Sequence, residues 1–364
     1  MVKRNRNVLF LANIDLNPNE GIYKKIIAQA KGFKNANSDG WIVTKQGGNS
    51  VYANTENEIF EVSRKNLFQL SKEIILRNNI RAVYIRHMIP SFSLVFFLLW
   101  LKKNNIEIYY EIPTYPYFSE QFRVSKKKYR ALVKIILDII FWPVIYMIIN
   151  HLIVIKSNSK VKVFKKMIEI TNGADTHSLK IKKYEQNYSK ISLVAVGTIY
   201  PYHGYDRILK GLKAINEEYN QKVIEINFIG KSSTLDDLKK LSEKLELKNV
   251  YFHGTKTTEE LNDLYDKFDL GLGCLALHRR DADIDTTIKV IEYYCRGVAV
   301  LTSGDSPLGE IFSNTTIKIA SNEDIIDLNY VLSEFEKITQ SDMQQISQLS
   351  INKFSWNKII FDLN

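Results

Sequence analysis

Two charged side chains three residues apart are the feature of this sequence that most directly suggests chemistry. Lys289 and Glu292 lie in residues 283–301, where a polar stretch precedes a helical segment that ends at Gly297. Residues three apart share one helix face, so the lysine can pair with phosphate oxygens while the glutamate accepts hydrogen bonds from a ribose diol. The pair predicts a site for a phosphorylated ligand that carries a ribose. The alternative is an ordinary surface ion pair, the usual explanation of an isolated Lys-x-x-Glu.

The residues that lead into this helix are predicted to line the same site. Asp285, Thr286 and Thr287 offer capping side chains for the first turn, and Ile288 follows them. Free N–H groups at a helix start, with the positive end of the helix dipole, favour a bound anion such as phosphate. After the helix, residues 298–301 form an apolar run that is typical of a buried strand.

A second segment that could bind a ligand, residues 109–120, follows a predicted strand. Two prolines and several aromatic rings make this segment a stiff, ring-lined loop. Such a loop suits sugars, because their apolar faces stack on rings while carboxylates bind their hydroxyls. We expect Glu111 to be the carboxylate that faces a sugar, with Tyr115, Tyr117 and Glu120 beside it. The alternative is a loop that prolines stiffen for structural reasons only.

Positive charge is concentrated in the first half of the 364-residue chain, which is long enough for two globular domains. Residues 1–170 contain 27 Lys and Arg against 12 Asp and Glu, a net charge of +15, whereas residues 171–364 have a net charge of −5. A basic half indicates an anionic partner, either nucleic acid or acidic lipid. No zinc spacing, recognition-helix signature or strand-binding pattern of aromatic and basic residues is found, so we do not predict nucleic-acid binding.

The sequence indicates a cytoplasmic location. Its two cysteines, Cys274 and Cys295, have neither metal-ligand spacing nor a disulfide pattern, which fits a reducing compartment. The apolar run at residues 8–12 is too short for a secretory signal and lacks a cleavage site, so it is better explained as a first strand.

Two apolar segments bear on membrane contact. Residues 92–101 are too short to span a bilayer. Residues 135–155 are long enough, but they contain Asp138 and Pro143, which argues against a span. A basic cluster at residues 125–130 precedes this segment, a pattern typical of an interfacial helix that binds anionic lipid. A buried core helix with a solvated basic start is the alternative.

Apolar runs alternate with helical segments along the whole chain, which predicts an α/β protein with ligands at the carboxyl ends of its strands. The predicted strands comprise residues 8–12, 40–44, 82–85, 106–110, 152–155, 191–196, 223–230, 249–254, 269–273 and 298–301. A lysine-rich polar stretch at residues 180–190 separates the two halves, as a linker would.

The order of parts around the Lys-x-x-Glu pair resembles the nucleotide-sugar motif of family-4 retaining glycosyltransferases, which have the GT-B fold. That family typically carries a Glu, seven residues, a second Glu, then a short helix and Gly-x-Pro-Val. Its second glutamate, which binds the donor ribose, corresponds to Glu292. Its first falls on Ile284, where Asp283 or Asp285 could substitute, and Ala299 replaces the proline.

Other landmarks of the family follow in order over residues 170–310. Residues 171–175 resemble its Asn-Gly-x-Asp linker, and residues 277–280 form a basic loop before the central motif, which we expect to contribute charge to the donor pocket. The family's donor-diphosphate loop corresponds to residues 198–207. Predicted donor-site residues in and near this loop are Gly197, His203, Gly204, Arg207 and Gly230.

The resemblance also implies a domain arrangement: two Rossmann-like domains facing across a cleft. The first would comprise residues 1–170 and about 355–364, the linker residues 171–190, and the second residues 191–354. The final helix would cross back to the first domain. The first loop would face the acceptor, which places Gly21 and Lys24 on the acceptor side.

The resemblance implies retaining transfer of a sugar from a nucleotide-sugar donor to a glycan acceptor, with no cofactor and no obligatory metal. Lys289, Arg207 and helix amides would neutralise the leaving diphosphate. The acceptor would be linked to a polyprenyl diphosphate, as in capsule or exopolysaccharide assembly, and the basic first domain would meet the inner face of the cell membrane. The alternative is a non-catalytic GT-B partner subunit or glycan-binding scaffold, which the residue Ile284 would favour.

Overall fold

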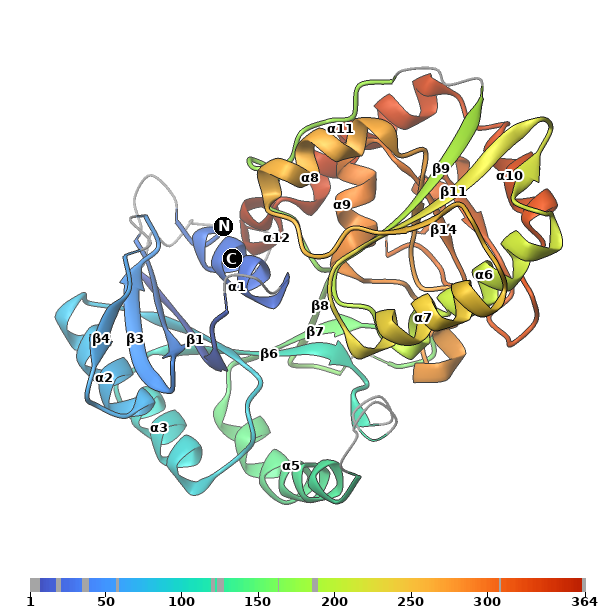
Figure 1. Cartoon of the computed structure of the whole chain (residues 1–364). Coiled ribbons are helices and arrows are strands. Elements are labelled where there is room, and N and C mark those ends of the chain that lie inside the picture. The colour runs from blue at the N-terminus through green and yellow to red at the C-terminus, as the bar shows by residue number, and fades with distance from the viewer. Residues whose placement is uncertain are drawn as a thin grey trace.

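The computed structural model describes residues 7–17, 21–34, 39–56, 59–118, 122, 128–162, 164–184, 189–307 and 309–361. They form two α/β domains, each built on one mostly parallel sheet with helices on both faces (Figure 1). The first sheet uses strands between Val8 and Ile170, and the second uses strands between Lys190 and Lys318.

The first sheet has the strand order β4-β3-β2-β1-β5-β6-β7-β8. Its strands are β1 (Val8–Asp15), β2 (Gly40–Gln46), β3 (Asn49–Asn54), β4 (Glu61–Ser63), β5 (Ala82–Arg86), β6 (Glu107–Tyr115), β7 (His151–Lys156) and β8 (Met167–Ile170). All neighbours pair in parallel except β2–β3 and β3–β4. This antiparallel ribbon was not predicted, although Gly47 and Gly48, both with positive φ, are the residues that a tight hairpin requires.

Helices cover the two faces of the first sheet differently. They are α1 (Gly21–Lys31), α2 (Leu67–Arg77), α3 (Phe92–Lys103), α5 (Lys128–Ile148) and, from the chain end, α12 (Trp356–Phe361). The helices α2, α3 and α5 pack into one core on one face, whereas α1 and α12 pack on the other (Figure 1).

The second sheet has the order β10-β11-β9-β13-β14-β15, with β12 also pairing with β11. Its strands are β9 (Lys190–Val196), β10 (Glu218–Tyr219), β11 (Lys222–Ile229), β12 (Val250–Phe252), β13 (Leu270–Leu272), β14 (Ala299–Thr302) and β15 (Thr316–Lys318). Its helices are α6 (Tyr205–Ala214), α7 (Ser233–Lys244), α8 (Thr258–Leu264), α9 (Ile288–Arg296), α10 (Leu328–Phe335) and α11 (Gln340–Phe354). The predicted strands of this half lie within two residues of the observed ones at most ends, because the central strands β9, β13 and β14 are short apolar runs buried on both faces.

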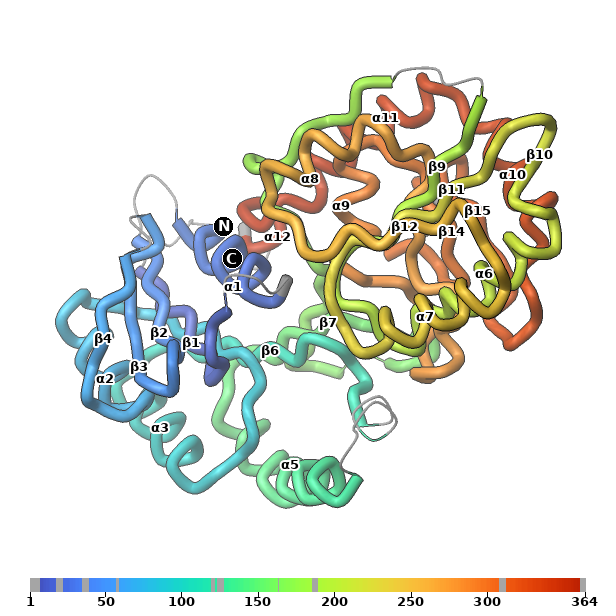
Figure 2. The backbone as a smooth tube through the Cα atoms, viewed as in Figure 1, coloured from blue at the N-terminus to red at the C-terminus, as the bar shows by residue number. Residues whose placement is uncertain are grey.

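The chain end returns to the first domain, as predicted (Figure 2). The segment leaves α11 beside the linker, where the Ala174 N–H donates to the Phe354 carbonyl at 2.9 Å. In α12, Trp356 and Ile359 then form a buried cluster with Ala28 of α1. The last helix therefore belongs to the first domain, although α11 belongs to the second.

The helix α5 is mostly uncovered, which argues against the buried-core alternative. Only four of its side chains are buried, and by length and composition it is apolar enough to cross a membrane. Exposed apolar side chains continue onto the neighbouring helix α3, and we call this surface the α3–α5 apolar face. Its residues are Phe92, Phe96, Leu99, Leu132, Val133, Ile136, Ile139, Ile140, Val144 and Met147. Part of the basic cluster predicted at residues 125–130 lies outside the described residues; Lys128 and Arg130 lie in the first turn of α5.

Candidate functional site

The predicted donor residues gather at the carboxyl ends of β9, β11, β13 and β14, in the loops that enter α6 and α9. Gly197 follows β9 and Gly230 follows β11, and both have positive φ. A Cβ atom on Gly230 would lie 2.1 Å from the Gly197 carbonyl oxygen. Glycine at position 230 therefore lets the two strand ends approach each other, and ligands bind at this edge in parallel α/β sheets.

Lys289 lies in the first turn of α9, where backbone N–H groups lack acceptors within the helix. Its ammonium donates to the Tyr205 hydroxyl at 3.1 Å and lies 5.3 Å from the centre of that ring. Burial lowers the pKa of Lys289 to about 8, and the nearby Arg280 adds to this effect. Because Lys289 is removed from water, its charged form gains from a bound anion, and the free N–H groups of the first turn of α9 can hydrogen-bond the same anion.

His203 lies beside Lys289, but it cannot supply charge. Its ring is 2% exposed and stacks on Tyr205 with centroids 5.5 Å apart. Burial, with the charges of Lys289 and Arg280, holds the His203 pKa well below its usual range. The Tyr200 N–H donates to Nδ1 at 2.9 Å, which places the proton of the neutral ring on Nε2. Nε2 makes no hydrogen bond to a described residue, so it can donate one to a ligand.

Arg280 is a third basic group of this site, in the loop at residues 277–280 that was expected to contribute charge to the donor pocket without a particular residue being chosen. It is 6% exposed, and its guanidinium lies 4.8 Å from the centre of the Tyr202 ring. The Tyr202 ring in turn packs against the His203 ring with centroids 4.7 Å apart, and the Arg280 charge lowers the pKa values of both His203 and Lys289. Sequence spacing could not identify it, because Arg279 and Arg280 are adjacent and only one of them turns inward.

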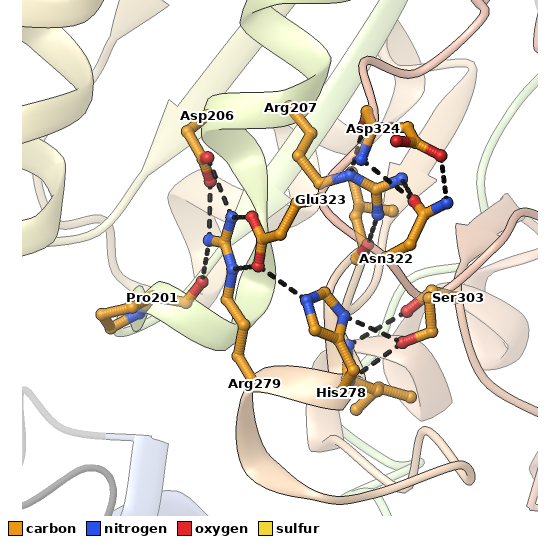
Figure 3. Close-up of polar contacts among 12 residues, drawn as sticks. Pro201, Asp206, Arg207, His278, Arg279, Ser303, Asn322, Glu323 and Asp324 are labelled. Carbon is orange, nitrogen blue, oxygen red and sulfur yellow. Dashed lines mark hydrogen bonds and ion pairs between the residues drawn. The ribbon is translucent and has the colours of Figure 1, made fainter.

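Arg279 instead points away from this cluster and joins its own loop to the segment at residues 201–206 (Figure 3). Its guanidinium donates to both carboxylate oxygens of Asp206, at 2.8 and 2.9 Å, to the Pro201 carbonyl and to Glu323. Behind the Arg279 side chain, Gly204 has a φ of 66°, and a Cβ atom there would lie 2.7 Å from that of Ala276. These contacts fix the segment that carries His203 against the one that carries Arg280.

The prediction that Arg207 binds the diphosphate was wrong. Its side chain is 2% exposed and ties two loops to the helix α6 (Figure 3). The guanidinium donates to the carbonyls of Asp324, Ala320 and Leu275 and to the side chain of Asn322. With its donors used in this way, Arg207 supports the site without facing a ligand.

The aspartates near the missing glutamate do not replace it, contrary to the expectation from the sequence. Asp285 is fully buried and accepts hydrogen bonds from the N–H of Cys274 (2.6 Å) and from the Thr302 and Thr287 hydroxyls (2.9 and 2.7 Å). Asp283 accepts from the N–H and hydroxyl of Ser159, in the segment after β7. Asp285 therefore fixes the start of α9, and Asp283 links the two domains.

Three other predicted donor residues lie at the start of α9. Thr287 is the N-cap residue of α9, and Ile288 is its first residue. The Thr286 carbonyl accepts a hydrogen bond from the Asn172 side chain at 2.6 Å. The predicted Asn-Gly-x-Asp linker thus holds the loop that precedes α9.

Glu292 faces the first domain from α9. Burial raises its pKa, while the charges of Arg296 and Lys24 oppose the increase. Its carboxylate makes no hydrogen bond or ion pair with any described residue. Lys24 reaches from α1 across the domain boundary and donates to the Thr258 hydroxyl at 2.9 Å. The structure therefore brings the predicted acceptor-side Lys24 close to the predicted donor-side Glu292.

Glu111 does not face a sugar, and the predicted loop around it is partly strand. β6 continues to Tyr115, so Glu111 lies within the sheet and is fully buried. Its carboxylate accepts hydrogen bonds from Gln29 (2.7 Å) and Arg86 (3.2 Å) and pairs with Lys25 (3.5 Å). These partners keep the Glu111 pKa below its usual range despite burial. The residue is a buried anchor for α1.

The remaining acceptor-side predictions have mixed outcomes. Tyr115 ends β6, and the Tyr117 ring packs at a tilt against that of His87, which follows β5, with ring centroids 4.9 Å apart. Gly21 begins α1. Glu120 lies outside the described residues. Across the residues that the structure describes, no three His, Cys, Asp or Glu side chains are grouped so as to hold a metal ion.

Comparisons with known proteins agree with this geometry. Residues 178–348 match the family described as "Glycosyl transferases group 1". No curated protein sequence is significantly similar to the chain.

Solved structures resemble the whole chain. A glycosyltransferase from Rickettsia africae ESF-5 has a TM-score of 0.63 at 13% identity, and the alignment covers 99% of this chain and 97% of that glycosyltransferase. WaaG, a glycosyltransferase involved in lipopolysaccharide biosynthesis, has a TM-score of 0.60 at 13% identity, with 98% and 99% covered. The catalytic domain of starch synthase IV from Arabidopsis thaliana, bound to ADP and acarbose, has a TM-score of 0.63 at 10% identity, with 96% of each chain covered. Residues 178–348 thus match a group 1 glycosyltransferase domain, and the whole chain has the GT-B fold that the sequence predicted.

Proposed function

We propose that this protein transfers a sugar from a nucleotide-sugar donor to a glycan acceptor. The observation that carries the proposal is the cluster of Lys289, Arg280 and the His203 Nε2–H around the start of α9. Glu292, one helical turn further, has a carboxylate free of described partners. The cluster suits a diphosphate, and the carboxylate suits the ribose attached to it.

In this proposal, the leaving diphosphate is stabilised as its bond to the sugar breaks. Lys289 and Arg280 supply positive charge, while the Nε2–H of His203 and the first amides of α9 supply hydrogen bonds, with no metal required. The neutral His203 ring, beside the cations Lys289 and Arg280, donates its Nε2–H to a phosphate oxygen. It does so at neutral pH without having to become protonated. We further propose retention by attack on the donor's own face, with the leaving phosphate taking the acceptor's proton.

We also propose that the acceptor is linked to a polyprenyl diphosphate and that the protein works in capsule or exopolysaccharide assembly at the inner face of the cell membrane. The support is the α3–α5 apolar face, with Lys128 and Arg130 at one end of α5. An apolar stripe with basic residues beside it fits the surface of an anionic bilayer. Vesicle flotation tests this: Ile136→Ser/Ile140→Ser should lose binding to anionic vesicles, whereas Val62→Ser/Ile325→Ser, exposed apolar residues elsewhere, should keep it.

Thermal shift with a panel of nucleotide-sugars tests the donor assignment. A ligand at a hundredfold excess over Kd stabilises the folded state by about 2.7 kcal/mol, which such a scan detects. One nucleotide class should stabilise the wild type and the surface control Lys239→Ala, but not Lys289→Ala or Glu292→Ala. Stabilisation that persists in both site variants would refute the donor site.

A non-catalytic GT-B subunit is the second candidate, and Ile284 at the position of a family glutamate favours it. Hydrolysis or transfer of the selected donor separates the two. An enzyme should release nucleoside diphosphate slowly without acceptor and faster with membrane extract. A scaffold should bind without any release.

A further inference from the structure

A pocket of about 780 Å³ in the first domain carries four basic side chains, and none of its described lining residues is acidic. Lys45 stands at the carboxyl end of β2, Arg64 and Lys65 precede α2, and Lys72 lies within α2. Four cations with no acidic side chain in the lining, one of them balanced by Glu73 outside it, give the pocket a positive potential. The pocket therefore suits an anionic ligand.

Two of these cations have no partner within the described protein. Lys65 forms an ion pair with Glu73, and Lys72 lies 5.2 Å from the centre of the Trp100 ring. In contrast, the side chains of Lys45 and Arg64 make no hydrogen bond or ion pair with a described residue. Their charges are available to a ligand.

Two helices also begin at the wall of the pocket. The N-cap residues Asn66 of α2 and Ser91 of α3 line it, and these helices have 11 and 12 residues. Each cap side chain accepts from one first-turn N–H, which leaves other first-turn amides without acceptors inside the helix. The positive ends of two helix dipoles add to the four side-chain charges.

The pocket borders the α3–α5 apolar face. Phe96 lines the pocket and is 66% exposed. Phe92, one turn earlier and 73% exposed, packs edge-on against Phe141 of α5 with ring centroids 5.2 Å apart. A ligand in the pocket could therefore extend a hydrocarbon chain over Phe96 and Phe92 onto α5. Such a neighbourhood fits an amphiphile with a phosphate head.

We propose that this pocket binds the phosphate or diphosphate group of a long-chain lipid, with the hydrocarbon chain lying on the α3–α5 apolar face. The inference rests on the proposed function, in which the acceptor is lipid-linked, and it names the part of the chain that holds the acceptor's phosphate groups. Lys45 and Arg64 bind the phosphate oxygens, Lys65 and Lys72 raise the local potential, and Phe96 contacts the first part of the chain.

Isothermal titration of the full-length protein with farnesyl diphosphate, farnesol and inorganic diphosphate tests the proposal. Farnesyl diphosphate should bind at least about tenfold more tightly than either other probe, because only it uses both the charges and the apolar face. Lys45→Gln/Arg64→Gln should weaken it by about tenfold or more. Lys102→Gln/Lys103→Gln, which removes the same charge from the far end of α3, should not.

Phe96→Ser separates a lipid from a soluble phosphate. It should weaken farnesyl diphosphate binding and leave inorganic diphosphate unchanged. Equal affinity for the two diphosphates, with no effect of Phe96→Ser, would assign the pocket to a soluble phosphate and overturn the proposal. Unchanged farnesyl diphosphate binding in the Lys45/Arg64 variant would also overturn it. Nucleotide-sugar stabilisation, measured on the same variants, should match that of wild type, which shows that they fold and separates this result from any failure of the donor site.

Discussion

The pKa of Lys289 makes nucleotide affinity depend on pH in a direction that the structure fixes. Burial holds this pKa at about 8 in the free protein, and a bound diphosphate would raise it by favouring the charged form. At pH values between the free and bound pKa values of Lys289, binding is therefore accompanied by protonation of Lys289. Affinity is highest below pH 8 and falls as the pH rises through 8. With a free pKa of about 8, about nine tenths of Lys289 is protonated at pH 7 and about one tenth at pH 9. The Kd for the nucleoside diphosphate should therefore rise about tenfold over that range, or about 1.4 kcal/mol.

Titration calorimetry from pH 7 to 9.5, with the nucleotide that the panel selects, measures this dependence. Lys289→Met should bind about 10- to 100-fold more weakly at pH 7, since a charged hydrogen bond is lost. Its affinity should also change little with pH, which provides the baseline for titration of the nucleotide itself. An equally steep pH dependence in Lys289→Met would refute the assignment of the proton to Lys289. A flat dependence in the wild type would refute the argument that burial lowers its pKa.

Three stability predictions follow from buried contacts, each measured by urea denaturation. Glu111→Ala should destabilise by about 3–5 kcal/mol, because it leaves Lys25 and Arg86 buried without their counter-charge, and it should leave nucleotide affinity unchanged. Asp285→Ala should cost about 2–4 kcal/mol through the donors that it leaves unpaired, and nucleotide affinity should fall with the order of α9. Gly230→Ala should cost about 3 kcal/mol or more, because its Cβ would overlap the Gly197 carbonyl oxygen, whereas alanine at exposed Gly48 should cost less. Little effect of Gly230→Ala would show that the two strand ends can separate freely.

The sequence was sufficient to predict the elements that position the donor site, because buried parallel strands have continuous apolar sequences. It also placed Lys289 and Glu292 correctly on one face of a helix, since that depends only on local spacing. Side-chain direction elsewhere depends on distant partners. Glu111 and Arg207 are charged residues beside predicted loops, yet each is buried by groups far away in the chain, such as Lys25 and Asn322.

The same limit explains what the sequence analysis missed at the site itself. Arg280 could not be separated from Arg279 until the loop conformation was known, because one guanidinium meets Asp206 outside and the other turns inward. The role of Asp285 as an anchor depends on Cys274 and Thr302, which reach it from two different strand ends. A motif predicts the types of residue at a site, whereas the loop geometry decides which of them a ligand can touch.

The chain passes between the domains twice at nearly the same place, and this arrangement has a mechanical consequence. Residues Ala174 and Ser355 pair in parallel there, on the outgoing and returning segments. Because both connections lie at one place, we expect relative motion of the domains to be a rotation about that place, and such a rotation must break the bonds that Asp283 makes with Ser159. Any such rotation must alter the approach of Lys24 to Thr258 and Glu292, which lie across the boundary. Because Lys24 belongs to the first domain and Glu292 to the second, such a rotation would change the distance between the predicted acceptor side and the predicted donor side of the site.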